Sequence, residues 1–126
     1  MRWQDIRVQL RCVIVDDDER FLDVARASLE REGVILAGVA DSRAAAVRLV
    51  PSLHPDVVLI DIRLGVESGF DVARDLAANG HAGWLIMISS YVEADYADLI
   101  AEAPVAGFLP KTELSAVAIR RVLGMA

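Results

Sequence analysis

The chain has 126 residues, of which 55% are hydrophobic, so it is large and apolar enough for one folded domain and does not read as a disordered segment. Its 19 acidic and 13 basic residues give a net charge of −6, which argues against a nucleic-acid-binding surface. The single cysteine, Cys12, excludes an intrachain disulfide and indicates a buried core thiol in a reducing compartment. Because the first ten residues lack the apolar core of a signal peptide and no apolar stretch could span a bilayer, we expect a soluble, cytoplasmic protein.

Strand and helix signals alternate five times along the chain. Apolar runs predict buried strands at residues 11–15, 35–40, 57–61, 84–89 and 106–109. Helical spacing of apolar residues predicts helices at 19–32, 70–78, 92–103, 113–123, and from a cap at Asp41 or Ser42 to Val50. Residues that commonly stop helices follow the first three of them in chain order, namely Gly33, Pro51 and Asn79-Gly80. The fourth helix has a predicted inner stripe of Val92, Tyr96, Leu99 and Ile100.

Alternating strands and helices predict an α/β fold, in which a doubly wound parallel sheet is covered by helices on both faces. No repeat, linker or low-complexity segment interrupts residues 11–124, so we predict one domain there. Residues 1–10 form an N-terminal extension that either frays or lengthens the first strand through Val8 and Leu10.

Four apolar runs end on polar residues that could act together. Asp16-Asp17-Asp18 follows the first strand, Asp61 ends the third, Ser89 ends the fourth, and Lys111 comes just after the fifth. The carboxyl ends of parallel strands lie at one edge of the sheet, where ligands bind. We therefore expect carboxylates, a hydroxyl and an ammonium group to converge in one crevice.

Asp61 is the predicted nucleophile toward phosphorus, because it ends a strand beside other carboxylates. Two carboxylates about 5 Å apart repel by roughly 3 kcal/mol at an effective dielectric constant near 20, so such a cluster raises its pKa values or recruits a cation. Oxygen ligands of this kind suit Mg²⁺. Asp18 is predicted to cap the first helix, which leaves Asp16 and Asp17 for the metal.

Ser89 and Lys111 have ordinary interpretations when each is taken alone. Ser89 could cap the fourth helix, and Lys111 could be a surface lysine. Together with the aspartates, the Ser89 hydroxyl could donate to a phosphoryl oxygen and the Lys111 ammonium could pair with phosphate. The joint occurrence of these residues at strand ends favours the functional interpretation.

These residues resemble the receiver domain of bacterial two-component response regulators over about residues 11–123. The matching positions are Asp16 and Asp17 as the acidic pair, Asp61 as phosphoacceptor, Ser89 at a Ser/Thr position, Phe108 at an aromatic switch position, Lys111, and Gly69 at the start of the third helix. The resemblance implies a flavodoxin-like (βα)5 receiver fold, with a five-stranded parallel sheet in strand order 2-1-3-4-5.

The resemblance also implies a function in signal transduction. Asp61 would accept a phosphoryl group from the phosphohistidine of a histidine kinase or phosphotransfer protein. Mg²⁺, or Mn²⁺ in its place, would be held by Asp16, Asp17, Asp61 and the backbone carbonyl of Arg63. Through Ser89 and Phe108, the surface of the fourth helix, fifth strand and fifth helix would then switch, so that it binds a downstream protein or a second copy. Such a protein is no enzyme beyond its own phosphorylation and dephosphorylation, and it needs no direct contact with nucleic acid or membrane.

The sequence departs from the family pattern in three places. Thr112 follows Lys111 where the family usually has proline, and Pro110 precedes it. Gly65 stands where proline is common, and Arg63 lies two residues past the phosphoacceptor, where the family suggests that its side chain influences dephosphorylation.

Three other functions stay open as alternatives. An aspartate-nucleophile phosphatase usually has a second acid two positions after its nucleophile, where this chain has Arg63. A receiver-like binding module that is never phosphorylated would not need the whole set of site residues. A nucleotide or flavin binder would need a glycine-rich loop after the first strand, which is missing. Because the chain stops just after the fifth helix, we expect a stand-alone receiver or one part of a larger polypeptide.

Two surface features suggest partner contacts. The outer face of the fourth helix is acidic, and this face is interpreted as a solvated surface or a docking surface. Its acidic residues are Glu93, Asp95, Asp98 and Glu102. Val117 shares a stripe of the fifth helix with Glu113, Arg120 and Arg121, and an apolar residue there could contact a partner.

Overall fold

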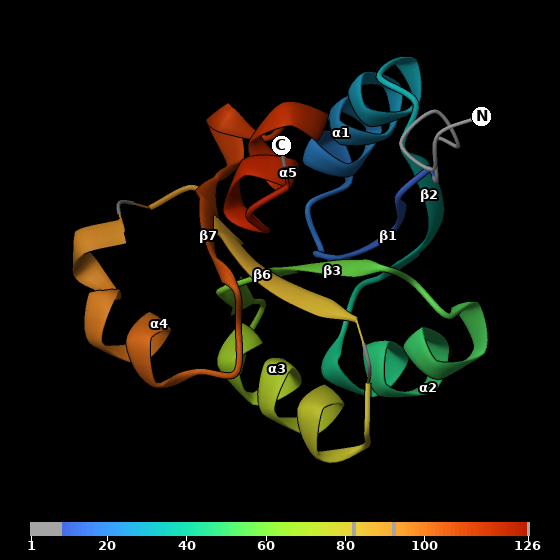
Figure 1. The fold of residues 1–126 in the computed structure, drawn as a ribbon. Coiled ribbons are helices and arrows are strands. Elements are labelled where there is room, and N and C mark those ends of the chain that lie inside the picture. The colour runs from blue at the N-terminus through green and yellow to red at the C-terminus, as the bar shows by residue number, and fades with distance from the viewer. Residues whose placement is uncertain (1–8, 82, 92, 126) are drawn as a thin grey trace.

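A five-stranded parallel sheet forms the centre of the molecule, and helices cover both of its faces (Figure 1). The computed structural model describes residues 9–81, 83–91 and 93–125. The strand order is β2-β1-β3-β6-β7, which confirms the expected order 2-1-3-4-5 and the flavodoxin-like α/β fold. The strands are β1 (Arg11–Val15), β2 (Ile35–Ala40), β3 (Val57–Asp61), β6 (Trp84–Ser89) and β7 (Gly107–Pro110).

Helices α1 and α5 cover one face of the sheet, and α2, α3 and α4 cover the other (Figure 1). Their bounds are α1 Glu19–Arg31, α2 Arg43–Leu53, α3 Gly69–Ala78, α4 Ala97–Glu102 and α5 Ala116–Val122. Successive residues of β1 alternate between two apolar clusters: Val13 and Val15 pack on the α2–α3 side, and Cys12 and Ile14 on the α1–α5 side. The central strands are therefore buried on both faces, which is why they read as continuous apolar runs.

Helix α2 is longer than predicted, because it passes through Pro51 and ends at Leu53. A proline in the last turn removes only one backbone hydrogen bond, while Val50 and Leu53 gain contacts with the core on either side of it. His54 caps the helix: its backbone is left-handed (φ 48°), and its N–H closes the last turn by donating to the Val50 carbonyl.

The predicted extent of the fourth helix, 92–103, is largely wrong. A 3₁₀ turn at Glu93–Asp95 comes first, and α4 covers only Ala97–Glu102. Tyr96 and Ile100 pack against the core as expected, whereas Leu99 is 49% exposed and does not belong to the inner stripe. The helix is short because no side chain caps its N-terminus and none of its residues is buried. Val92 lies outside the described residues.

The fifth helix also begins later than predicted. A 3₁₀ turn at Lys111–Glu113 follows β7, and α5 starts after Ser115, whose hydroxyl accepts a hydrogen bond from the Ala118 N–H. This serine cap sets the start of the helix, and the amphipathic pattern alone did not reveal it.

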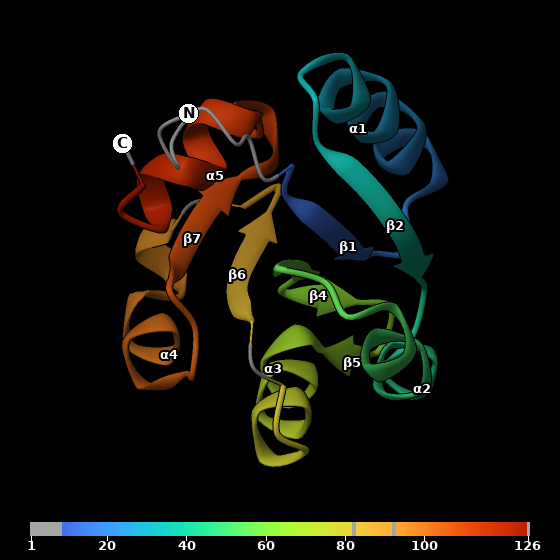
Figure 2. The same cartoon turned by 45° about the vertical axis from the view of Figure 1, so that its right-hand side comes forward.

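The loop after β3 contains a short antiparallel hairpin that was not predicted (Figure 2). Its strands are β4 (Arg63–Leu64) and β5 (Glu67–Ser68), and Gly65 adopts a positive φ of 61° at the turn. At the N-terminus, Leu10 is buried against the α1–α5 side but is not part of β1, and Val8 lies outside the described residues. Within the described part of the chain, no helix combines the length and the apolar character that crossing a membrane requires.

Candidate functional site

Three aspartates lie together where β1 and β3 leave the sheet. Asp16 follows β1 and is fully buried, Asp17 next to it is exposed, and Asp61 is the last residue of β3 and is 7% exposed. One carboxylate oxygen from each residue lies within 4.8 Å of the other two. The structure thus brings together the three carboxylates that the sequence singled out.

Local backbone contacts fix the aspartates in these positions. Asp18 caps α1, since its Oδ1 accepts hydrogen bonds from the N–H groups of Arg20 and Phe21 at 3.1 and 3.2 Å. The Asp18 N–H in turn donates to Asp16 Oδ1 at 2.9 Å, which fixes the Asp16 carboxylate in a tight turn directly after β1. The cap and the turn hold Asp16 and Asp17 where their carboxylates lie close to that of Asp61.

Lys111 reaches the cluster from the 3₁₀ turn after β7. Its Nζ lies 2.7 Å from Asp16 Oδ2 and 3.0 Å from Asp61 Oδ2, and 4.5 Å from the centre of the Phe21 ring. The sequence Pro110-Lys111-Thr112, which departs from the family pattern, still delivers the ammonium group to the carboxylates. All peptide bonds among the described residues are trans.

The site carries more negative than positive charge. Burial, followed by the nearby Asp16 carboxylate, raises the pKa of Asp61 to about 6, against the opposing effects of Lys111 and of the Arg63 N–H. Burial acts to lower the pKa of Lys111, but its contacts with Asp16 and Asp61 outweigh that and raise it above the ordinary value. A protonated lysine thus faces three carboxyl groups, an arrangement that favours a further cation.

The donor set fits Mg²⁺ or Mn²⁺ in its chemistry. These ions prefer carboxylate and carbonyl oxygens, and the three aspartates supply such oxygens within one small volume. Arg63, whose backbone carbonyl is a further predicted ligand, is held next to the cluster because its N–H donates to Asp61 Oδ1 at 3.1 Å.

Gly69 is required by the backbone of the site. A Cβ at this position would clash with the Asp61 carbonyl oxygen, so no other residue fits here unless the backbone moves. The N–H of Gly69 also donates to the Ile62 carbonyl at 2.8 Å. The first residue of α3 therefore packs directly against the strand end that carries Asp61.

Ser89 ends β6, the strand next to β3, and Phe108 lies on β7, one strand further from the aspartates. The Ser89 side chain is 1% exposed, and its Oγ accepts a hydrogen bond from the Tyr91 N–H at 2.9 Å, which leaves the hydroxyl hydrogen available to donate. Ser89 does not cap α4, whose N-cap position is occupied by Tyr96. Phe108 is 8% exposed and belongs to the apolar cluster on the α2–α3 side.

The sequence analysis missed a contact between Arg63 and two tyrosines. The Arg63 guanidinium donates to the Tyr96 hydroxyl at 3.1 Å and to the Tyr91 hydroxyl at 3.4 Å, and it lies 4.3 Å from the centre of the Tyr91 ring. The tyrosines are about thirty residues away in sequence. Only the convergence of the β3 and β6 ends at one sheet edge could have suggested the contact.

Comparison with known proteins identifies the family. The response regulator receiver domain model matches residues 12–122. The chain belongs to this family.

NarL of Mycobacterium tuberculosis, a transcriptional regulatory protein, is 30% identical over 94% of this chain and 55% of its own length. EvgA of Escherichia coli K12, a DNA-binding transcriptional activator, is 26% identical over 82% of this chain and 51% of its own length. The receiver chain thus spans about half the length of the curated relatives that it matches.

Solved receiver structures agree with this assignment. The signal receiver domain of NarL from M. tuberculosis superposes with a TM-score of 0.81 at 28% identity, covering 94% of this chain and 99% of that one. The signal receiver domain of a modulated diguanylate cyclase from Desulfovibrio desulfuricans G20 gives a TM-score of 0.78 at 32% identity, with 94% of each chain covered. The predicted family and fold are therefore confirmed, and the protein is a receiver domain of two-component systems.

Proposed function

We propose that this receiver accepts a phosphoryl group on Asp61 from the phosphohistidine of a histidine kinase or phosphotransfer protein. One observation carries the proposal: Asp61 shares an ammonium group, Lys111, with the buried Asp16, while Asp17 completes a set of carboxylates suited to a divalent cation. A carboxylate in this setting can attack phosphorus while the surrounding cations balance charge on the phosphoryl oxygens.

Each residue of the site has a distinct task in this transfer. Asp61 forms the new P–O bond as the P–N bond of the donor histidine breaks. Asp16, Asp17, Asp61 and the Arg63 carbonyl would hold Mg²⁺, which neutralises phosphoryl oxygens when it is bound. Lys111 pairs with a further phosphoryl oxygen, and the Ser89 hydroxyl donates to another.

The proposed output is a change of surface and not a reaction on another substrate. Once Ser89 turns toward the phosphoryl group, space opens beside β7 in which the Phe108 side chain, already buried in the unmodified protein, can repack, and the α4–β7–α5 surface changes. A downstream protein or a second copy of the chain would recognise that surface in the cytoplasm. We propose no direct contact with nucleic acid, because the chain carries a net charge of −6.

Phosphorylation with acetyl phosphate and Mg²⁺, followed by intact mass and peptide mapping, tests this function. We expect one base-labile phosphoryl group on Asp61, none in Asp61→Asn, and none when a chelator removes the metal. Asp17→Asn tests the role of the metal. Removing one carboxylate relieves like-charge repulsion and should raise the melting temperature of the metal-free protein. Because a metal ligand is lost, the same variant should not be phosphorylated. Retention of the modification in Asp61→Asn would refute the assignment.

The surface change has its own measurement. Backbone NMR of the protein with and without beryllofluoride, which stands in for the phosphoryl group, should show shifts in α4, β7 and α5 as well as in the loops around Asp61. Shifts that stay within those loops would contradict the switch and leave the phosphoacceptor assignment intact.

A further inference from the structure

A groove of about 370 Å³ runs between the β4–β5 hairpin and α4, next to the aspartate cluster but separate from it. Buried Ile62 lines it from the link between β3 and β4, Phe70 from α3, and Tyr96 from the start of α4. The opposing walls carry Val66 on the hairpin and Leu99 on α4. None of these five side chains belongs to the proposed phosphoryl-transfer machinery.

The two wall residues are exposed without a local reason to be apolar. Val66 is fully exposed at the tip of the hairpin, where turn chemistry favours polar residues, and Leu99 is 49% exposed on α4. Isolated apolar residues are common on protein surfaces, but these two line the same groove from opposite sides. Together they form an apolar cleft that could hold a side chain of a partner.

The α4 side of the groove carries exposed acidic residues next to Leu99. Asp98 precedes Leu99, and Glu102 lies one helical turn after it on the same face of α4. Glu67 lines the hairpin wall, but its carboxylate is turned to the Arg43 N–H, and α4 has no basic residue. The one basic residue that lines the groove, Arg63, directs its guanidinium at Tyr91 and Tyr96. A partner that complements this surface is apolar where it meets Val66 and Leu99 and positively charged where it lies along α4.

We propose that the groove docks a basic amphipathic segment of a partner protein, with an apolar side chain between Val66 and Leu99 and lysines or arginines beside Asp98 and Glu102. An amphipathic helix is the simplest such segment, because residues three and four apart place apolar anchors on one face and charges beside them. The walls are exposed in the unmodified protein, so docking does not require a phosphoryl group. The inference therefore goes beyond the proposed function and can fail independently of it.

The probe is a designed helical peptide with a leucine stripe and lysines on its other faces, labelled for fluorescence anisotropy against the full unphosphorylated chain. We expect saturable binding that weakens as salt rises, since exposed charges contribute to it. A matched peptide with every lysine replaced by glutamate should bind at least tenfold more weakly. Asp61→Asn should bind the lysine peptide as well as the wild type does.

Matched variants locate the binding. Leu99→Ser and Val66→Ser should each weaken the lysine peptide at least fivefold, whereas Val117→Ser on α5 and Val24→Ser on α1 should not, because those exposed valines lie away from the groove. A double charge reversal, Asp98→Lys with Glu102→Lys, should reverse the preference and bind the glutamate peptide more tightly. All substituted residues are exposed, so circular dichroism should show unchanged folding.

The contrary results are equally specific. Undiminished binding by Leu99→Ser and Val66→Ser, or equal loss in Val117→Ser, would place the peptide elsewhere and overturn the proposal. So would tighter binding of the glutamate peptide to the wild type. Concentration-dependent dimerisation that Leu99→Ser abolishes, with no peptide binding, would show that the groove serves a second copy instead.

Discussion

Helices α3 and α4 follow neighbouring strands and cover the same face of the sheet, but they are held in place very differently. Helix α3 has ten residues and a serine cap, and five of its residues are buried, namely Gly69, Phe70, Val72, Ala73 and Leu76. Helix α4 has six residues, no side-chain cap and no buried residue. Helix α3 is thus part of the core, whereas α4 packs on the core without burying any whole residue in it.

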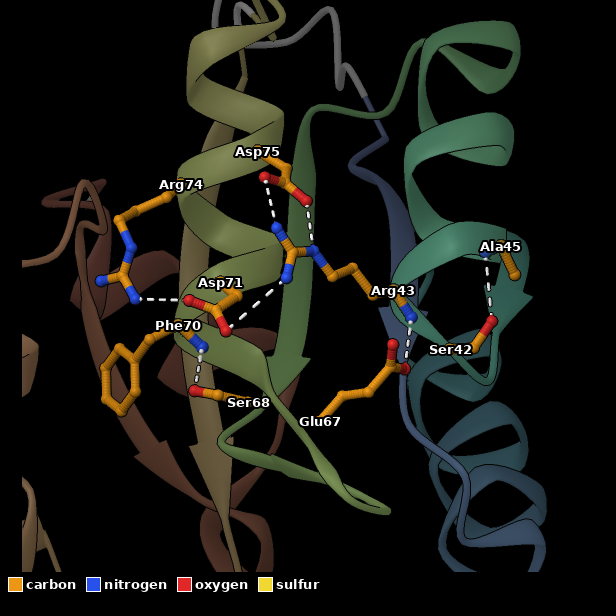
Figure 3. Close-up of polar contacts among 9 residues, drawn as sticks. All are labelled: Ser42, Arg43, Ala45, Glu67, Ser68, Phe70, Asp71, Arg74 and Asp75. Atoms are coloured by element: carbon orange, nitrogen blue, oxygen red, sulfur yellow. Dashed lines mark hydrogen bonds and ion pairs between the residues drawn. The ribbon is translucent and has the colours of Figure 1, made fainter.

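Polar contacts widen the difference (Figure 3). The Arg43 guanidinium at the start of α2 pairs with Asp75 at 2.6 Å and with Asp71 at 3.7 Å, and Arg74 also pairs with Asp71. The Glu67 carboxylate of the hairpin accepts a hydrogen bond from the Arg43 N–H at 2.9 Å. Helix α3 is therefore tied to α2 and, through α2, to the hairpin, and α4 shares none of these contacts.

The comparison indicates which part of the molecule can move at low cost. Displacing α3 would expose buried side chains and shift the carbonyl of Asp61, against which Gly69 packs. Displacing α4 would cost little burial, so a modest difference in affinity at the aspartate site could reposition it. This asymmetry supports the proposal that α4, and not α3, carries the output.

Truncating one leucine on each helix should give the largest contrast. Leu76→Ala on α3 removes a side chain that is 1% exposed and should destabilise the protein by about 2–5 kcal/mol. Leu99→Ala on α4 should change stability by less than about 0.5 kcal/mol, because that side chain is already half exposed. Urea unfolding of both variants measures the difference, and similar losses would mean that α4 is packed as firmly as α3.

The second prediction concerns the carboxyl group of Asp61, whose backbone packs against α3. The folded pKa of Asp61, about 6, lies above its unfolded value near 3.9, so the folded state binds the proton more tightly. The metal-free protein should therefore lose stability as pH rises from about 4 to 6, by on the order of 1 kcal/mol once partial solvent screening is allowed for. Melting temperatures across that range provide the measurement.

Asp61→Asn is the control for this pH dependence. Burial lowers the pKa of His81, which contributes stability of the opposite slope as pH rises toward 6.5, but both proteins keep that histidine. The difference between wild type and variant thus isolates Asp61. Saturating Mg²⁺ should abolish the decline, and a decline of equal size in Asp61→Asn would show that another group causes it.

A smaller effect is expected from the ion pairs that join α2 to α3. Arg43→Met keeps the length of the side chain and removes its charge, so the melting temperature should fall slightly at low salt and hardly at all in 1 M NaCl. Arg26→Met on α1, which loses a single exposed pair with Glu30, is the matched control. A drop for Arg43→Met that persists in high salt would point to lost packing rather than lost charge.

The sequence predicted the elements that long apolar runs or caps define. The runs at 11–15 and 57–61 correspond to β1 and β3 because central strands are buried on both faces, and Asp18 was recognised as the cap of α1. The strand order came from the family resemblance, because periodicity shows that strands are parallel but not which ones are neighbours. The same resemblance named Gly69, and the structure supplies the reason, which is the carbonyl of Asp61.

The errors occur where tertiary contacts override local pattern. Leu99 has helical spacing with Tyr96, but the short α4 turns it toward solvent. Pro51 usually ends a helix, yet core contacts on either side carry α2 past it. The Arg63 side chain was expected only to influence dephosphorylation, because contacts with residues about thirty positions away leave no local signal.

The smallest expected effect tests the one side-chain hydrogen bond described between the β4–β5 hairpin and the start of α4. Tyr96→Phe removes the hydroxyl that accepts from Arg63 Nε and keeps the ring that packs on the core. The melting temperature should not change measurably, since the contact is exposed, but amide hydrogen exchange in 97–102 should accelerate while exchange in 69–78 stays the same. Tyr91→Phe, which loses the longer 3.4 Å contact but keeps its ring beside the guanidinium, should have less effect on α4. Equal acceleration in both helices would mean that α3 and α4 open together, and the contrast between a fixed and a loosely held helix would then be wrong.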